Sequence, residues 1–135
     1  MFKLNLVTPE KKIVMDQELA EISLPAFAGE LNILPGHAPL LTTLAAGILK
    51  YKLKTGETKK MAISWGYCQV SSEGVNVLAE TAVESDEIDV KVVQENLKGF
   101  ERKMIAEHLN DEDWTKAHHE IERLKAEINL LNVKH

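Results

Sequence analysis

The side chains best suited to metal or acid–base chemistry in this sequence are its histidines and its single cysteine, Cys68. The histidines are His37, His108, His118, His119 and His135. None of them falls in an HExxH pattern, and one cysteine with scattered histidines does not supply the ligand set of a zinc site. His118 and His119 are neighbours, so on a helix they point about 100° apart and do not chelate one ion. We therefore expect no metal site.

The sequence also lacks the patterns that mark enzymes. It contains no GxxxxGK[ST], GxGxxG or GxSxG motif. Ser64 stands in an alternating strand pattern, and no general base can be placed beside Cys68 from the sequence. The carboxylates of the second half of the chain alternate with Lys and Arg, as on solvated helix faces. We expect a non-catalytic protein without a cofactor.

Composition and charge limit the classes of partner. The 135 residues are 44% hydrophobic and 27% charged, with a net charge of −5. A nucleic-acid binder normally presents a basic face, so we expect no nucleic-acid partner. No stretch approaches 18 consecutive apolar residues, so we expect no direct membrane insertion. A single cysteine and an N-terminus without signal-peptide character favour a cytoplasmic location.

Residues 1–85 predict strands. Apolar residues alternate with polar ones in several short runs, and turn residues such as Thr55-Gly56 and Ser72-Glu73-Gly74 separate these runs. The alternating positions include Phe2, Leu4, Leu6, Leu49, Tyr51, Leu53, Met61, Ile63 and Trp65. Short strands at this spacing are typical of an all-β sandwich or barrel.

Residues 86–135 predict two helices. Val93, Leu97, Phe100 and Met104 form one helical stripe, and a second stripe contains Trp114, Ala117, Ile121, Leu124, Ile128 and Leu131. Ser85 is the expected N-cap of the first helix, and Asp111 or Asp113 that of the second. A short polar connection favours an antiparallel hairpin, so the expected fold class is α+β. With one apolar stripe per helix, the hairpin should be marginally stable unless it docks on the sandwich, a partner or a ligand.

One stretch departs from an ordinary strand connection. It reads GELNILPGHAPLLTTLAAGIL and begins at Gly29. Pro35-Gly36 suits a turn with a positive φ at the glycine. Glu30 and His37 flank the apolar Leu31–Leu34 run, which a connecting loop alone does not require. Shaping that loop is the alternative role for these two side chains.

This stretch resembles the signature region of the epsilon subunit of bacterial and chloroplast F-type ATP synthases, and the resemblance extends over the whole chain. It implies a flattened sandwich of about ten strands that binds the rotating gamma subunit and rests on the membrane c-ring. It implies a non-catalytic central-stalk subunit of a proton- or sodium-translocating enzyme, peripheral on the cytoplasmic face of the bacterial inner membrane. By position, Glu30 and His37 match residues that contact the c-ring.

The resemblance also implies a regulatory role for the helical hairpin. In the family the hairpin lies folded on the sandwich or extends along gamma toward the alpha and beta subunits, where it blocks ATP hydrolysis. Basic residues of the second helix take part, and the candidates here are Arg123, Lys125, Lys134 and, less clearly placed, Lys116. Glu120, Glu122 and Glu127 dilute this positive patch.

Some members of the family bind ATP in the folded hairpin. Ile88, Asp89 and Arg123 match positions of their motif. Val92, Val93 and Glu127 depart from it, and a glutamate beside a triphosphate is repulsive. A degenerate ATP site of low affinity is therefore the most that the resemblance implies.

Two other classes of protein remain as alternatives. The chain would be a stand-alone β-sandwich adaptor with a helical arm if it bound another partner and had no affinity for gamma. A small enzyme is the other alternative, and no group of residues in the sequence supports it.

Overall fold

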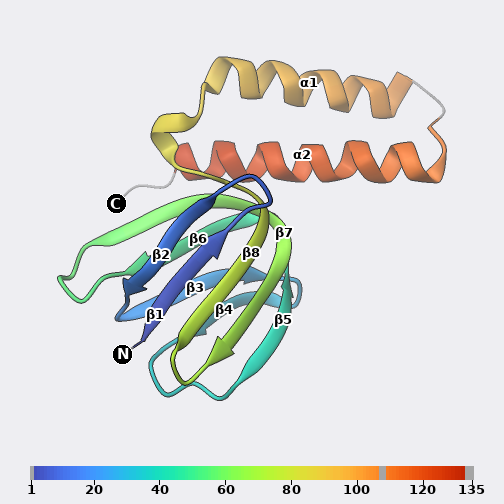
Figure 1. The fold of residues 1–135 in the computed structure, drawn as a ribbon. Helices are drawn as coiled ribbons and strands as arrows, with labels where there is room; N and C mark the ends of the chain where they lie inside the picture. The colour runs from blue at the N-terminus through green and yellow to red at the C-terminus, as the bar shows by residue number, and fades with distance from the viewer. Residues whose placement is uncertain (1, 107–108, 133–135) are drawn as a thin grey trace.

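The protein folds as a β-sandwich with a helical hairpin laid across one end (Figure 1). The computed structural model describes residues 2–106 and 109–132. Its strands are β1 (Lys3–Val7), β2 (Lys12–Glu18), β3 (Glu21–Ala26), β4 (Gly29–Ile33), β5 (Leu40–Leu44), β6 (Gly47–Lys52), β7 (Thr58–Ser71) and β8 (Gly74–Val83). A 3-10 turn, η1 (Ser85–Glu87), leads to helices α1 (Val90–Ala106) and α2 (Asp111–Asn132). The expected α+β class is confirmed.

The strands form one hydrogen-bonded sheet that folds over on itself. Its order is β2-β1-β8-β7-β5-β3-β4, and β6 pairs with both β3 and β7. All pairs are antiparallel except β1 with β8. The first half of β7 pairs with β6 and its second half with β5, so this strand belongs to both layers.

Apolar side chains from every strand except β2 fill the space between the layers with fully or almost fully buried groups. The largest are Leu4, Leu6, Ile22, Leu24, Ile33, Leu44, Leu49, Met61, Ile63 and Val75, with Leu19 from the β2–β3 connection. The alternation that predicted the strands is therefore the alternation between core and surface.

The ladder between β7 and β8 is interrupted at a single rung. Register pairs run from Ala62 with Val83 to Ser71 with Gly74, and only Trp65 and Glu80 are missing. Trp65 has a φ of 29°, which is rare for a residue with a side chain. The core-facing residues of β7 change parity there, from Met61 and Ile63 to Cys68 and Val70.

This kink explains the number of strands. The family resemblance implied about ten strands, whereas the described residues form eight. β7 and β8 each continue through the kink from one layer to the other. Each is therefore counted as one long strand, where a break at the kink would give two short ones.

Both helices begin at a different cap from the expected one. The Oδ1 atom of Asp89 accepts hydrogen bonds from the backbone N–H groups of Lys91 and Val92, at 3.1 and 3.3 Å, so Asp89 caps α1. Ser85 lies in η1 instead, whose cap is Glu84. The Oδ1 atom of Asn110 accepts from the Asp113 N–H at 2.8 Å, so Asn110 caps α2 in place of Asp111 or Asp113.

The hairpin docks mainly through α2. α2 lies between α1 and the sandwich, against β6 and β7 (Figure 1). Of the expected a/d stripe, Ala117, Ile121 and Leu124 are buried, whereas Trp114 and Leu131 are 48% and 36% exposed. A second set, Ala126 and Leu130, packs on Ala46, Ile48, Ala62, Val83 and Ile88. The expectation of one apolar stripe per helix was therefore wrong for α2, which has a face for α1 and another for the sandwich. None of the helices described is long and apolar enough to cross a membrane.

Candidate functional site

An apolar patch lies on the outer surface of β5, β7, β8 and β1. Leu41, Tyr67 and Leu78 are 72%, 57% and 45% exposed. Tyr67 pairs with Leu78 and Leu78 with Val7, so these side chains form a row across the strands. A shallow hollow of about 350 Å³ lies among them, and its other lining residues are Asn5, Gln69, Asn76 and Val77. We call Val7, Leu41, Tyr67 and Leu78 the apolar face.

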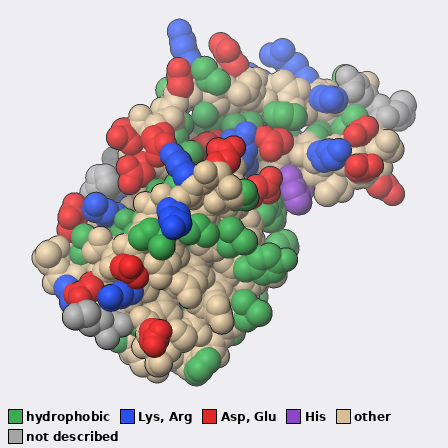
Figure 2. Space-filling view, in the orientation of Figure 1, with side chains coloured by type: hydrophobic (Ala, Val, Ile, Leu, Met, Phe, Trp, Pro, Cys, Tyr) green, Lys and Arg blue, Asp and Glu red, His purple; other side chains and the backbone are tan. Residues whose placement is uncertain are grey.

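None of the described residues that line the hollow of the apolar face is charged, although the chain is 27% charged. Figure 2 shows hydrophobic side chains gathered on the flank of the sandwich where Figure 1 places β5 and β7. A contiguous exposed apolar surface on a soluble domain is typical of a protein-binding surface.

A second surface joins α2 to the kink in the β7–β8 ladder. The Trp65 indole stacks on the His119 imidazole, with ring centroids 4.3 Å apart and planes inclined by 20°. Phe27 lies in the β3–β4 connection, and its ring centroid is 5.8 Å from that of the Trp65 indole. Trp65 is therefore the aromatic link between the sandwich and the helical arm.

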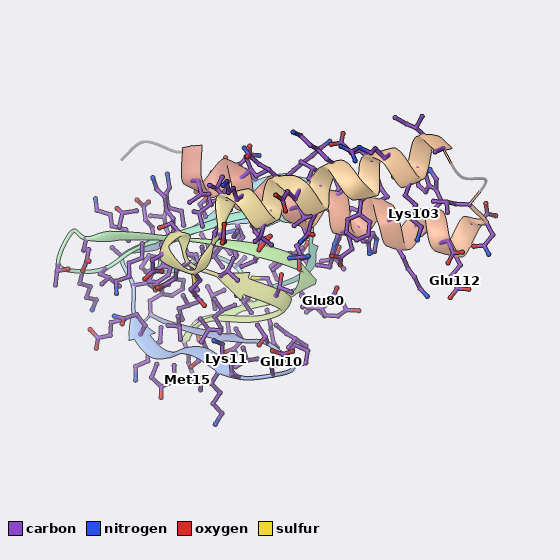
Figure 3. The ribbon with its side chains drawn as sticks, turned by 90° about the horizontal axis from the view of Figure 1, so that it is seen from above. Glu10, Lys11, Met15, Glu80, Lys103 and Glu112 are labelled. Carbon is purple, nitrogen blue, oxygen red and sulfur yellow. The ribbon has the colours of Figure 1, made fainter. Side chains whose placement is uncertain are left out.

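One helical turn further along α2, Arg123 is held by carboxylates. Its Nη2 lies 2.6 Å from the Glu120 carboxylate, and its Nη1 lies 3.2 Å from Oε2 of Glu127. Burial lowers the pKa of Arg123, but the hydrogen bond and charge of Glu120 and the charges of Glu127 and Glu80 outweigh it and raise the pKa. Glu80 belongs to the interrupted rung opposite Trp65, and Figure 3 labels it among the strands of the sandwich.

Glu127 is the charged residue most deeply placed at this junction, with 8% of its surface exposed. Burial raises the pKa of its carboxyl, Arg123 opposes that rise, and Glu120 adds to it. An ion pair normally lowers a carboxyl pKa. Here desolvation of the buried carboxyl outweighs the Arg123 charge and the pKa rises, with the nearby Glu120 charge adding to the rise.

Glu30 and His37 are placed near opposite ends of β4. Glu30 is exposed at the start of the strand, and its Oε1 accepts a hydrogen bond of 2.5 Å from the buried Ser23 hydroxyl. His37 follows the end of the strand and closes a turn in which its N–H donates to Leu34 O at 3.0 Å. Gly36 has a φ of 90°, as the sequence predicted for this turn. The two side chains are therefore not brought together, and their c-ring role stays a prediction.

The candidate basic residues of α2 differ in their surroundings. Lys125 is exposed, and Lys116 pairs with Glu112 at 3.2 Å on the solvated side of the helix. Arg123 is engaged by Glu120 and Glu127 as described. Lys134 lies outside the described residues, as do His108 and His135.

The residues of the degenerate ATP motif have structural contacts in the folded arm. The Asp89 carboxylate caps α1. Ile88 is half-buried against the small cluster of Ala62, Ala126 and Leu130. Nucleotide binding at Ile88, Asp89 and Arg123 stays a prediction.

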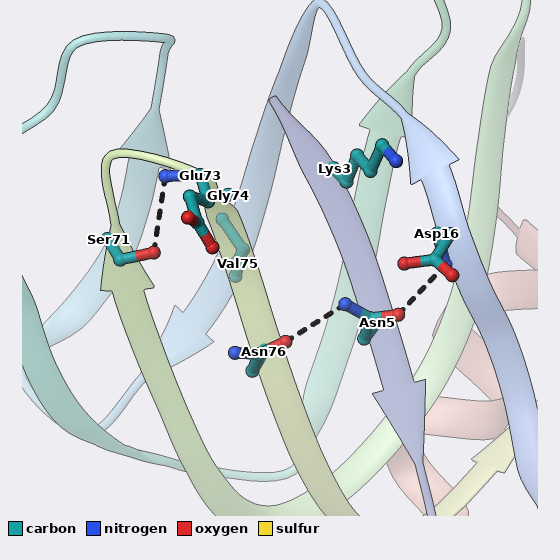
Figure 4. Close-up of a pocket in the computed structure, with 8 residues that line it drawn as sticks. All are labelled: Lys3, Asn5, Asp16, Ser71, Glu73, Gly74, Val75 and Asn76. Carbon is teal, nitrogen blue, oxygen red and sulfur yellow. Dashed lines mark hydrogen bonds between the residues drawn. The ribbon is translucent and has the colours of Figure 1, made fainter. Parts of the chain in front are cut away.

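The polar pocket beside β1 serves the fold (Figure 4). It has a volume of about 430 Å³, and an amide ladder runs along it. Asn5 donates to Asn76 at 3.0 Å and accepts from the Asp16 backbone N–H at 2.8 Å. Asp16 has a φ of 51° at a register shift between β1 and β2. The ladder therefore holds a β-bulge in place.

Three exposed carboxylates gather at η1. Oxygens of Glu84, Asp86 and Glu87 lie within 4.8 Å of one another. Glu84 and Glu87 form the reciprocal capping box of this turn, which accounts for the position of two of the three.

The sequence did not single out Trp65, Glu80 or His119 as partners. Their contact joins residues far apart in the chain, and no local period reports it. The one available signal was the pair of adjacent histidines on α2, since His118 stacks on Trp114 of its own helix and His119 faces the sandwich.

A sandwich with an exposed apolar face and a docked helical arm defines a protein-interaction module. Residues 1–85 match the family described as "ATP synthase, Delta/Epsilon chain, beta-sandwich domain". The chain is 52% identical over 127 residues to the ATP synthase epsilon chain of Bdellovibrio bacteriovorus, which covers 93% of this chain and 91% of the relative. The chain belongs to the delta/epsilon family of ATP synthase subunits.

Solved structures share the fold at lower identity. A chain of the Euglena gracilis mitochondrial ATP synthase, in a structure of OSCP, F1 and c-ring, superposes with a TM-score of 0.84 at 23% identity, covering 96% of this chain and 81% of that one. A chain from the central stalk and c-ring of the Tetrahymena thermophila enzyme gives 0.69 at 18% identity, covering 96% of each chain.

Proposed function

We propose that this chain is a non-catalytic central-stalk subunit of an F-type ATP synthase that couples rotation of the gamma subunit to a proton- or sodium-conducting c-ring. The sandwich binds the stalk, and the hairpin is a brake on ATP hydrolysis. The chain sits peripherally on the cytoplasmic side of the bacterial inner membrane. Family membership supports the assembly, and the uncharged apolar face is the observation that carries the binding role.

The apolar face supplies the surface for gamma. Leu41, Tyr67 and Leu78 stand on strands of a rigid sandwich, so little conformational entropy is lost when a partner covers them. Glu30 and His37, at the two ends of β4, are assigned to polar contacts with c-ring loops. These contacts seat the stalk on the ring, and the apolar face holds it to gamma.

The hairpin acts as a bistable arm. In the folded state Trp65 stacks on His119, and the Glu80 charge acts on Arg123 from the next turn of α2. Among the described residues, α1 packs mainly on α2, so releasing α2 from the sandwich frees most of the arm. Because few contacts hold α2 to the sandwich, the docked and released states differ little in free energy. Rotation or nucleotide state can then bias the equilibrium between them. The released arm reaches the alpha and beta subunits through Arg123, Lys125 and Lys134.

Gamma binding tests the proposal. The full chain should bind purified gamma with a Kd at or below the micromolar range, and Leu41→Glu should weaken binding by at least about tenfold, a loss of about 1.4 kcal/mol. Met15→Glu is the matched control, because Met15 is an exposed apolar residue on β2, outside the apolar face. Absence of gamma binding by the wild-type chain would contradict the proposal.

A further inference from the structure

A wide, open cavity lies at the junction between the sandwich and the last turns of α2, and Glu30, Lys50 and Asn129 in its lining are exposed to solvent. Its volume is about 440 Å³, within the range of sites that hold small molecules. Most of its wall is apolar and comes from the end of β3, the β5–β6 connection and Ile48. The polar groups that line it are Ser23, Glu30, Lys50, Lys60 and Asn129.

Two of these polar groups form an unusual pair. Lys50 of β6 and Lys60 of β7 are direct cross-strand partners. Residues opposite each other in an antiparallel pair have Cβ atoms about 4.5–5.5 Å apart, and like charges in that position are destabilising. Within the part of the chain that the structure describes, no carboxylate lies within 4.0 Å of either ammonium group. The two ammonium groups are therefore not held in close ion pairs, although Glu84 and Asp86 line a neighbouring pocket with Lys60, and Glu21 lines another with Lys50.

The remaining polar groups limit the charge of a ligand. Glu30 brings one carboxylate to the cavity, and its Oε1 is already engaged by the Ser23 hydroxyl. Among the residues that line this cavity, two ammonium groups stand against one carboxylate, while Glu21, Glu84 and Asp86 line the neighbouring pockets. The Asn129 amide adds a neutral donor and acceptor from α2. A ligand that matches these groups has one anionic head and an apolar body.

We propose that this cavity binds a small amphiphilic anion, an organic carboxylate or phosphate monoester whose head lies between Lys50 and Lys60 and whose apolar body lies against Ile48 and its neighbours. Because Asn129 belongs to α2, the complete site exists only when the arm is docked. A ligand bound there stabilises the docked arm by its difference in affinity for the two states.

Phenyl phosphate is the probe, with inorganic phosphate and phenol as its two halves. In ¹⁵N-resolved NMR titrations of the full chain, phenyl phosphate should give saturable shifts at Ser23, Ile48, Lys60 and Asn129. Benzoate, which carries a carboxylate head on the same ring, distinguishes the two ligand sources. Each half-probe should bind at least about tenfold more weakly than phenyl phosphate, equivalent to about 1.4 kcal/mol.

Variants separate this site from general attraction of an anion to lysines. Lys60→Ala and Lys50→Ala should each weaken phenyl phosphate binding about tenfold. Lys54→Ala, on the same hairpin but paired with Glu18 at 3.6 Å, should leave binding unchanged. The proposal is overturned if neither phenyl phosphate nor benzoate gives saturable shifts, if phenol binds as tightly as either anion, or if Lys54→Ala weakens binding as much as Lys60→Ala. Binding is measured without gamma or the catalytic core. Failure of ligand binding can therefore be distinguished from failure of gamma binding.

Discussion

Trp65 and Glu80 occupy the one interrupted rung of the β7–β8 ladder, and each interacts with a side chain of α2. Trp65 stacks on His119, and the Glu80 charge acts on Arg123, one helical turn further along α2. The backbone kink that lets β7 and β8 pass between layers also creates the docking point of the helical arm.

Removing the Trp65 ring should loosen the arm. Trp65→Ala deletes the stack on His119, and an aromatic pair contributes about 0.5–1.5 kcal/mol beyond the area it buries. We expect faster amide hydrogen exchange along α2 with strand exchange little changed. Trp114→Ala is the control, because the Trp114–His118 stack lies within α2 and survives release of the arm. Equal effects of the two substitutions would show that Trp65 has no special part in docking.

Acidification should strengthen docking through Glu127. Burial raises the pKa of this carboxyl in the docked state. Its stabilising contribution is therefore complete below the ordinary glutamate pKa and is lost as the pH rises through the raised value. Thermal melts of wild type and Glu127→Gln from acid to neutral pH should diverge, with wild type losing relative stability as the pH rises. Glu112→Gln, on the exposed first turn of α2, should follow wild type. Parallel curves for wild type and Glu127→Gln would refute the assignment.

Arg123 and Lys125 should differ sharply in their effect on stability. Arg123→Met leaves Glu127 buried without its cation, and we expect a loss of about 1–3 kcal/mol in the free energy of unfolding or docking. Lys125 is exposed, so Lys125→Met should change stability by less than about 0.5 kcal/mol. Urea unfolding followed by helix circular dichroism measures both. Similar small effects would mean that the Arg123 ion pairs are dispensable.

Two glycines provide a test of the fold itself. A Cβ at Gly66 would collide with the backbone carbonyl of Leu78 on the neighbouring strand, whereas one at Gly99 of α1 meets nothing within 4 Å. Gly66→Ala should cost about 1–3 kcal/mol. Gly99→Ala should gain about 0.5–1 kcal/mol, because alanine favours the helix. Chemical unfolding of both variants decides this, and a neutral Gly66→Ala would contradict the close β7–β8 packing.

The sequence predicted the features that depend on local periodicity or on a turn residue. Alternation placed Leu4 and Leu6 in the core, the stripe from Ala117 to Leu124 identified buried residues of α2, and Gly36 marked a positive-φ turn. These features depend on neighbours within a few residues.

The features that were missed depend on distant contacts. The cap of α1 is Asp89 rather than Ser85, because the helix begins only after η1 and Ile88 pack on the sandwich. Leu130 belongs to a second buried face of α2 that exists only because β6 and β7 cover it. The stack of Trp65 on His119 joins two elements whose order in the chain gives no sign of contact.

ATP hydrolysis by the catalytic core, measured alone, with the full chain and with residues 1–85, tests the central claim most directly. Gamma binding by both forms is confirmed in the same samples. The full chain should inhibit hydrolysis, and residues 1–85 should bind gamma without inhibiting, because the arm is the brake and the sandwich is the anchor. Inhibition by residues 1–85 as strong as that by the full chain would contradict the account.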